Sequence, residues 1–442
     1  MQDTTIDWLL GTPRPLILYA VPFFLLLIGV EILVGIASRR RFYRFNDSVN
    51  DLSCGIIDQV TRIFFQGALF AGYLYLYRHW RLTEMTEWSA AAKWGAAIAL
   101  VLGVDLGFYW FHRIAHEYSA PWATHVVHHQ SEEYNLAVAL RQSAFESCFA
   151  WIFYLPLALI GFPPLWYATI SAINLLYQFW VHTEAIDRLG PLEWVMNTPS
   201  HHRVHHARNP KYLDKNYAGM FIIWDRMFGT FQVEEEQPVY GLTRPLESWN
   251  PIWANLHYWV HLWRQAREAP YWTDKIKIWF MPLGWTPRGV APYPPAPEVT
   301  RESVKKYNAR VGLGMTLYVL FQFSCVLVGA VVVMGLEKSK PVTWLATPAA
   351  LVFWSLANLG AIFERRPWAG RSELARIGVT GAVLGSFGVA SGMTWLAIAA
   401  GAWTIVSLAW LWPQRATLAP REAPNAASAV TETSDRQLAS TS

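Results

Sequence analysis

The sequence predicts an all-α protein, a multi-pass bundle of transmembrane helices that carries a histidine-rich dimetal site on its cytosolic face. Hydrophobic residues make up 53% of the 442 residues and charged residues only 15%, which is the balance of a membrane protein. Apolar runs of about the 20 residues needed to cross a bilayer recur along the chain. Ten of the thirteen histidines fall between residues 112 and 206, and this concentration predicts the metal site.

The apolar runs predict roughly nine membrane spans. The pairs at 144–181 and 374–412 can alternatively form re-entrant hairpins. The start of the chain lacks a basic region and a small-residue cleavage site, so we expect the first run to stay as an anchor. The runs cover 15–36, 53–77, 91–111, 144–162, 164–181, 311–336, 343–363, 374–390 and 393–412.

Arginines that follow the first run predict the orientation of the bundle. Arg39, Arg40 and Arg41 come directly after this run, and an excess of arginine and lysine marks the cytoplasmic side of a membrane protein. Alternation of the spans then brings all three histidine clusters to the cytoplasmic face. We expect an integral membrane protein, in the inner membrane if the source is bacterial and in the endoplasmic reticulum if it is eukaryotic.

The histidine clusters are HRIAH at 112–116, HVVHH at 125–129 and HHRVHH at 201–206, with His182 between the last two. Residues three and four apart share one face of a helix, so each cluster can aim several imidazoles at one place. Imidazole suits zinc, copper, iron and nickel. One tetrahedral ion uses only about four ligands, so two adjacent metal ions fit better. The candidate ligands are His112, His116, His125, His128, His129, His182, His201, His202, His205 and His206.

Three carboxylates near the histidines are the catalytic candidates. Asp105 lies seven residues before His112, inside an apolar run, and an ionisable residue within a span predicts function. Glu117 adjoins the first cluster and Glu184 follows His182 by two residues. We expect these carboxylates to orient ligand rings by accepting their N–H groups, although each can equally be a structural helix partner.

The rest of the chain predicts five regions. It gives no sign of a disulfide framework, of a cysteine metal site or of a nucleic-acid partner. Three cysteines give neither a disulfide framework nor a thiolate metal motif. The net charge of +4 fits membrane topology, so we expect no nucleic-acid partner. The predicted regions are N-terminal transmembrane helices at 1–90, a histidine-box catalytic domain with a cytosolic cap at 91–281, a Pro-rich linker at 282–310, C-terminal transmembrane helices at 311–412 and a disordered tail at 413–442.

Motifs around the histidines extend well beyond the ligands themselves. The chain reads DLGFYWFHRIAHE at 105–117, SEEYNLAVALRQS at 131–143, LLYQFWVHTE at 175–184, NTPSHHRVHH at 197–206 and DKNYAG at 214–219. This arrangement resembles the fatty acid hydroxylase/sterol desaturase superfamily of membrane di-iron enzymes, and is most similar to its alkylglycerol monooxygenase branch. By this resemblance the ten histidines except His201 are the iron ligands, and His201 is an additional candidate. In the wider superfamily a further histidine can stand where this chain has Gln178.

The resemblance implies two iron ions, O2 as co-substrate and a lipid substrate held in the membrane. For the alkylglycerol branch it implies hydroxylation of the ether-linked carbon of a glyceryl ether, with tetrahydropterin as reductant. The hemiacetal product then separates into a fatty aldehyde and glycerol. The sequence contains no cytochrome-type haem motif, no GxGxxG after a strand and no four-cysteine pattern, so we expect an external electron donor.

Three alternatives remain open from the sequence. Another member of the superfamily would act on a sterol, a carotenoid or a fatty acyl chain. A zinc-dependent membrane hydrolase is suggested by the loose likeness of HRIAHE to the HExxH motif, but it leaves the third histidine cluster without a use. A metal transporter would place its ligands near the membrane midplane and not at one face.

Overall fold

The computed structural model describes residues 5–11, 16–309 and 311–414. All the regular elements in these residues are helices, with only isolated bridges between extended residues, and the all-α prediction is confirmed. Most of the predicted disordered tail, from residue 415 onward, lies outside the described residues. Its first two positions, Pro413 and Gln414, still belong to a helix.

Six helices of the described chain are long and apolar enough to cross a membrane. They supply six of the nine predicted spans. The pair at 374–412 forms two helices, each long and apolar enough to cross a membrane. The six helices are α2 (Leu16–Ser38), α4 (Ala90–Glu117), α14 (Leu313–Leu336), α15 (Val342–Phe363), α16 (Ala369–Ala390) and α17 (Thr394–Gln414).

The other three predicted spans take different forms. The fifth becomes α9 (Pro164–Trp180), a helix of 17 residues that is not among the six. The second becomes part of α3 (Phe45–Trp80), a 36-residue helix whose first half buries Asp51 and Asp58 and is therefore less apolar than a simple span. The fourth breaks into α7 (Ser147–Ala150), a 3-10 turn and α8 (Leu155–Ile160). Pro156 in the first turn of α8 lacks an N–H and so favours a new helix start at this point.

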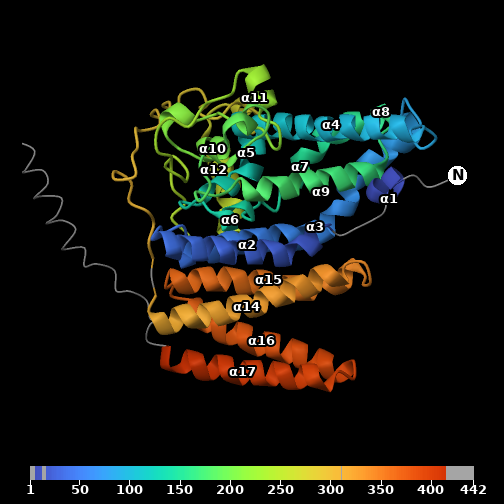
Figure 1. Cartoon of the computed structure of the whole chain (residues 1–442). Coiled ribbons are helices and arrows are strands. Elements are labelled where there is room, and N and C mark those ends of the chain that lie inside the picture. Colours follow the sequence, from blue (N-terminus) through green and yellow to red (C-terminus); the bar gives the residue numbers. More distant parts are fainter. Residues whose placement is uncertain (1–4, 12–15, 310, 415–442) are drawn as a thin grey trace, which may run out of the picture. The chain divides into compact units, whose positions relative to one another are not determined.

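The long helices of the first part of the chain run side by side, and the short helices that carry histidines lie at one end of them (Figure 1). Helix α4 and helix α9 (Pro164–Trp180) both end there, beside α5 (Ser119–His125) and α10 (Pro199–His205). At the opposite end, the Leu82 amide donates to the Leu159 carbonyl, 2.7 Å away. Between the second histidine cluster and His182 the chain therefore crosses the bundle to this opposite end and returns along α9.

Aromatic and small apolar side chains pack α3, α4 and α9 together. Leu100, Val104 and Trp166 are buried in this cluster, and the stacked rings of Tyr73 and Tyr167 lie 4.4 Å apart. Lipid is as apolar as these side chains, so close packing and interhelical hydrogen bonds must hold the helices together. The Tyr73 hydroxyl supplies one such bond, 2.9 Å from the Phe162 carbonyl oxygen.

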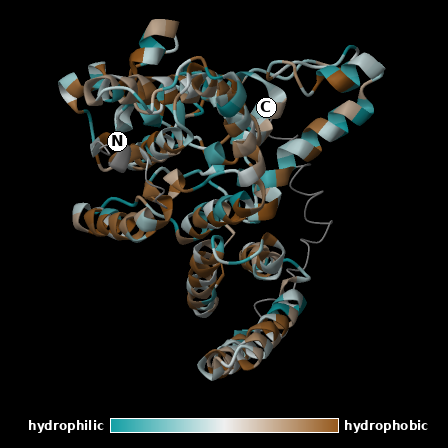
Figure 2. Ribbon diagram, turned by 90° about the vertical axis from the view of Figure 1, so that its right-hand side faces the viewer, coloured by the Kyte–Doolittle hydropathy of each residue, from teal (hydrophilic) through white to brown (hydrophobic). Residues whose placement is uncertain are grey.

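The outer face of α2 shows that the chain is an integral membrane protein. Phe23, Leu26, Leu33 and Ile36 are each more than 60% exposed. Brown hydrophobic turns are prominent on the long helices in Figure 2. A soluble protein rarely leaves so large an apolar surface open to water, whereas lipid chains accept it.

The chain divides into two compact units. The first comprises residues up to 308 together with 326–356, and the second comprises 309–325 and the chain from 357 onward. In the second unit α16 and α17 pair through small residues. A Cβ atom on Gly388 would lie 2.7 Å from the Ala397 amide nitrogen, so only glycine permits this close approach. The five predicted regions stay predictions.

Candidate metal centre

Nine of the ten predicted histidines form two adjacent groups in the first unit. Each histidine of a group offers one ring nitrogen, and within a group these nitrogens all lie within 4.8 Å of one another. Every member is buried. The five-histidine group consists of His112, His116, His125, His129 and His205. The four-histidine group consists of His128, His182, His202 and His206.

Short helices at the end of the bundle produce this convergence. The last two turns of α4 place His112 and His116 on one face, because residues four apart are neighbours on a helix. Helix α5 and the 3-10 turn η1 (His128–Gln130) divide the second cluster between the two groups. Helix α10 divides the third cluster in the same way, and His182 follows directly on the end of α9.

Backbone carbonyls fix the tautomers of four rings. The Nδ1 atom of His112 lies 2.7 Å from the Tyr217 carbonyl oxygen, and the Nδ1 atom of His128 lies 2.9 Å from that of Arg141. His182 and His205 make the same contact, at 2.8 Å and 3.0 Å, to residues 178 and 215. A neutral imidazole has one N–H, so in these four rings the proton is on Nδ1 and Nε2 keeps a free lone pair.

These lone pairs point at one another. The Nε2 atoms of His128 and His182 are 3.1 Å apart, although neither carries a proton. The Nε2 atoms of His182 and His202 are 3.0 Å apart, as are those of His112 and His125. Two acceptors at this distance repel unless a cation lies between them. The buried Nε2 of His205 has no hydrogen-bond partner in the described structure, which fits the same interpretation.

Burial keeps the rings available as ligands near neutral pH. Desolvation lowers the pKa of His128 to about 4 and that of His205 to about 3, because the charged imidazolium loses its hydration. Both imidazoles are therefore neutral at pH 7. Nine imidazole nitrogens without a thiolate suit a first-row transition metal, so the residues fit a pair of such ions.

His201 lies outside both groups. Its side chain is buried, but its ring packs against Phe231, with the ring centroids 5.4 Å apart. The adjacent His202 turns into the four-histidine group instead. Consecutive residues on a helix point about 100° apart, so the doublet HH at 201–202 cannot aim both rings at one ion.

Asp105 binds a loop and not a histidine. Its carboxylate accepts hydrogen bonds from Asn174, from the backbone amides of Met220 and Phe221 and from the Trp224 indole, at 2.7 to 2.9 Å. The segment from 217 to 221 is held by this carboxylate, and its Tyr217 carbonyl fixes the His112 ring. Asp105 therefore acts on the centre through the backbone.

Glu117 and Glu184 also lack a contact to a histidine ring. Glu117 accepts from Arg113 at 2.8 Å and is partly exposed. Glu184 accepts from the Tyr240 hydroxyl at 2.9 Å and from Arg301. The geometry therefore gives neither carboxylate the ring-orienting contact that we expected from the sequence.

Glu146 is the carboxylate that does face a ligand ring. Its Oε2 atom lies 3.3 Å from Nδ1 of His125, an arrangement that orients metal-bound imidazoles in many proteins. We did not single out this residue from the sequence. A signal was present, because Glu146 is an ionisable residue inside the apolar run 144–162.

Two buried arginines hold the histidine-bearing loops. Arg141 donates to the Val127 carbonyl at 2.7 Å and pairs with Asp51 at 3.1 Å, which ties the second cluster to α3. Arg203 donates to the Thr183 carbonyl at 3.1 Å and pairs with Glu234 at 2.7 Å. Arg203 stands among histidines in HHRVHH, whereas the motif of Arg141 contains no histidine. Both side chains hold the backbone of the segments that carry the ligands.

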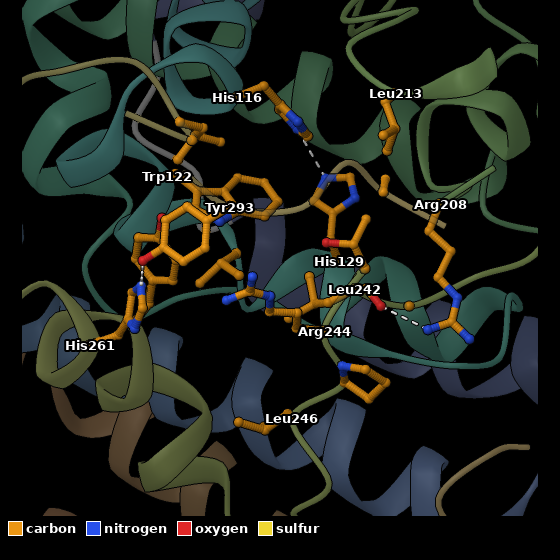
Figure 3. Close-up of a pocket in the computed structure, with 18 of the residues that line it drawn as sticks. His116, Trp122, His129, Arg208, Leu213, Leu242, Arg244, Leu246, His261 and Tyr293 are labelled. Atoms are coloured by element: carbon orange, nitrogen blue, oxygen red, sulfur yellow. Dashed lines mark hydrogen bonds between the residues drawn. The ribbon is translucent and has the colours of Figure 1, made fainter. Parts of the chain in front are cut away.

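Two cavities of the first unit reach the histidines. A cavity of about 770 Å³ is bounded by His116, His129, His205 and His206 (Figure 3). An apolar cavity of about 140 Å³ ends at His128 and His182. The walls of the apolar cavity include Val21, Phe24, Leu25, Ile56, Leu175 and Phe179. The two cavities have no wall residue in common.

Comparisons with known proteins agree with this centre. The fatty acid hydroxylase family matches residues 97–230, which include every histidine of the two groups. Alkylglycerol monooxygenase of Xenopus tropicalis is 41% identical over 365 residues, which cover 81% of this chain and 79% of that protein. Alkylglycerol monooxygenase of Homo sapiens is 39% identical over 362 residues, which cover 81% and 80%.

A shorter match points to the same superfamily. Ornithine lipid hydroxylase of Rhizobium tropici is 31% identical over 143 residues, which cover 31% of this chain and 43% of that protein. No solved structure matches the chain. The vertebrate relatives are matched over about four fifths of their length, and the resemblance found in the motifs is confirmed. The chain belongs to the alkylglycerol monooxygenase family, within the fatty acid hydroxylase superfamily.

Proposed function

We propose that this chain is an iron-dependent monooxygenase that cleaves O-alkyl glycerol ethers in a membrane. It hydroxylates the carbon next to the ether oxygen, and the hemiacetal then separates into a fatty aldehyde and glycerol. One observation carries the proposal: two buried groups of imidazoles adjoin each other, and an apolar cavity ends at His128 and His182. The names of the vertebrate relatives support this substrate.

The two groups are proposed to hold two iron ions. Oxidation of an unactivated C–H bond needs a metal that changes oxidation state, which zinc does not do. When bound, the metal pair would supply oxygen activation. The protein would contribute nine imidazole ligands, and backbone carbonyls would hold the tautomers of four of them, including His112 and His182.

The apolar cavity is proposed to hold the alkyl chain of the substrate. Phe24 and Phe179 stack in its wall, with the ring centroids 4.3 Å apart. Such walls attract an aliphatic chain and keep bulk water from the oxidised carbon. Gln142 and Gln178 also line the cavity near the histidines, where their amides can bond the ether or hydroxyl oxygens of a glyceryl ether.

The reaction needs electrons from outside the chain. Insertion of one oxygen atom into a C–H bond reduces the second atom of O2 to water, which consumes two electrons and two protons. We propose tetrahydropterin as the donor, from the resemblance to the alkylglycerol branch. A separate redox protein is the other class of donor, and both fit a chain without a haem or flavin motif.

The centre is proposed to face the cytoplasm. Arg39, Arg40 and Arg41 connect α2 to α3 at the end of the bundle where the histidines lie. The excess of arginine in this short loop supports a cytoplasmic position. The membrane is then the inner membrane in a bacterium or the endoplasmic reticulum in a eukaryote.

The test is an incubation of iron-loaded full-length protein with a glyceryl ether, a sterol or a free fatty acid, with and without tetrahydropterin. We expect fatty aldehyde from the glyceryl ether only when both oxygen and the pterin are present. Oxidised sterol or fatty acid instead of aldehyde would assign the chain another superfamily substrate. Activity that survives anaerobically in a zinc-loaded sample would identify a hydrolase and refute the proposal.

A further inference from the structure

Helix α14 presents one face to the apolar cavity. Its wall residues recur at intervals of three and four positions, the spacing that places side chains on one side of a helix. Val328 and Val332 point to the other side and are 65% and 54% exposed. The helix therefore has the cavity on one side and an apolar outer surface on the other. The wall residues of α14 are Leu327, Ala330, Val331 and Met334.

Three other long helices complete the wall with stripes of similar spacing. The stripes of α2 and α14 contain only apolar side chains, whereas α3 also contributes Asp58 and Gln59, and α9 contributes Gln178. Between α2 and α14 a bound molecule would therefore contact hydrocarbon alone. The apolar members are Ile17, Val21, Phe24 and Leu25 on α2, Leu52 and Ile56 on α3, and Leu175 and Phe179 on α9.

The α2 stripe extends the cavity away from the histidines. Phe24 stacks on Phe179, which precedes the ligand His182 by three residues. Helix α2 runs toward the histidine end of the bundle (Figure 1). Ile17 precedes Phe24 by seven residues, so it lies about 10 Å further from that end. The cavity is therefore elongated along the bundle, with the metal centre at one end.

Helix α14 borders the remote part of this cavity. Val333 and Met334 pack in one cluster with Ile63 of α3 and Leu345 of α15, and all four belong to the first unit. Helix α3 begins at the histidine end of the bundle, and Ile63 follows Leu52 of the cavity wall by eleven residues, or about 16 Å. The last turn of the α14 stripe therefore lies well away from the metal centre.

The cavity suits a slender chain better than a fused ring system. Its volume of about 140 Å³ is below the range of most small-molecule sites, about 300 to 1,000 Å³. Ala330 has the smallest side chain of the α14 stripe and is 1% exposed. Protein interiors are packed closely enough that a change of one methylene is felt. Side-chain size on α14 therefore controls how much room the cavity has.

We infer that α14 selects the alkyl chain of the lipid. Leu327, Ala330, Val331 and Met334 contact the part of the chain remote from the oxidised carbon and set the longest straight chain that is accepted. This inference rests on the proposed function, which places the oxidised carbon beside His128 and His182. The match to the fatty acid hydroxylase family ends at residue 230, so α14 adds a selectivity that lies outside the matched domain.

The first test compares kcat/KM for 1-O-octadecylglycerol and 1-O-decylglycerol in the iron-loaded full-length protein. Val331→Phe enlarges a side chain of the cavity wall, and its matched control Val328→Phe makes the same change on the exposed side of α14. We expect Val331→Phe to lower the octadecyl-to-decyl ratio about tenfold or more, because one misfitting methylene in an apolar site is worth about 10- to 200-fold. Val328→Phe should keep the ratio.

Met334→Ala provides the opposite change. It removes side-chain volume from the remote part of the wall and should raise the octadecyl-to-decyl ratio. A folding defect in any variant lowers kcat/KM for both ethers by the same factor and leaves the ratio unchanged. The ratio therefore reports on the cavity, and iron content and thermal unfolding are measured beside it.

The second test locates the chain without turnover. An octadecyl glyceryl ether with a diazirine at the last carbons of its chain is bound to anaerobic, zinc-loaded protein and activated by light. Mass spectrometry then identifies the labelled residues. We expect label within 327–334 that an excess of unlabelled ether displaces, and Val331→Phe should reduce this displaceable label.

The outcomes separate the inference from the proposed function. Equal ratios in Val331→Phe and Val328→Phe, in a chain that cleaves both ethers, would overturn the role of α14 and leave the proposed function standing. Label in 327–334 that excess ether does not displace would come from the surrounding lipid and would also overturn it. Conversely, displaceable label in 327–334 of a chain that cleaves no ether would support the site and contradict only the proposed function.

Discussion

Two buried polar clusters of this protein differ in whether their own hydrogen-bond donors and acceptors are paired with one another. In the second unit, Arg376 donates to both carboxylate oxygens of Glu373 at 2.8 and 2.6 Å and to Gln322 at 2.9 Å. Gln322 in turn donates to Ser407 at 2.8 Å. In this ion-pair network donors meet acceptors and opposite charges lie together, although Arg376 and Glu373 are almost completely buried.

The histidine centre of the first unit has the reverse arrangement. Its acceptors face acceptors, because carbonyl oxygens hold the ring protons of His128 and His182 on the far side of each ring. The ion-pair network is complete within the chain, whereas the centre needs a cation from outside. The lesson is that a buried polar cluster indicates a ligand site when its own atoms leave one another unsatisfied.

The largest effect should come from removing a ligand of the histidine centre. His128→Ala or His205→Ala should abolish activity, a loss of more than about 100-fold, because even residues that only orient metal ligands change activity by about 10- to 100-fold. Bound metal should fall while the protein still inserts, since neither ring supports the helix packing. Activity assays with metal analysis on purified protein check this, and normal turnover by either variant would refute its ligand role.

Breaking the ion-pair network should instead affect stability and leave the metal in place. Glu373→Leu leaves Arg376 buried without a charge partner, and we expect a loss of about 3 to 5 kcal/mol. The double variant Glu373→Leu/Arg376→Leu should recover much of that loss, because apolar side chains replace the whole pair. Thermal unfolding in detergent measures both. If the double variant were no more stable than the single one, the pair would have a function beyond packing.

A smaller effect should follow from Glu146→Gln, which keeps the shape of the side chain but removes its charge beside His125. We expect a decrease of about 10- to 100-fold in metal affinity or activity. The control is Glu84→Gln, a partly exposed carboxylate paired with Arg81 at the other end of α3. Metal titration of both variants makes the comparison. Equal metal affinities of the two variants would show that Glu146 does not support the centre.

Much of the centre could be predicted from the sequence, because helical spacing alone places histidines three and four residues apart on one face. The same rule explains why His112 and His116 belong to one group. It does not reveal how the clusters are divided. His128 and His129 are adjacent in the chain but enter different groups, because η1 turns one ring to each side. Only the fold of the loops decides this.

The carboxylates were harder to predict, because proximity in sequence says little about contacts across a bundle. Asp105 lies on the histidine face of α4, yet its carboxylate accepts hydrogen bonds from Asn174 and from the amides of a loop more than a hundred residues away. Glu146 meets His125 although 21 residues separate them. The run at 144–162, for which a re-entrant hairpin was the alternative to a span, is divided into short helices, and a new helix starts at Pro156.

The smallest effect should come from His79→Ala, a histidine that belongs to neither cluster of the comparison. His79 is exposed near the end of α3, where its ring contacts only Tyr75 among aromatic neighbours, with centroids 4.8 Å apart. Helix α3 starts at the end of the bundle that holds the metal centre, and 36 residues at about 1.5 Å each carry His79 some 50 Å away. Metal content and turnover should therefore match the unchanged protein. A loss of bound metal in this variant would mean that both ends of α3 communicate with the centre, which contradicts the gathering of all three histidine clusters at one end.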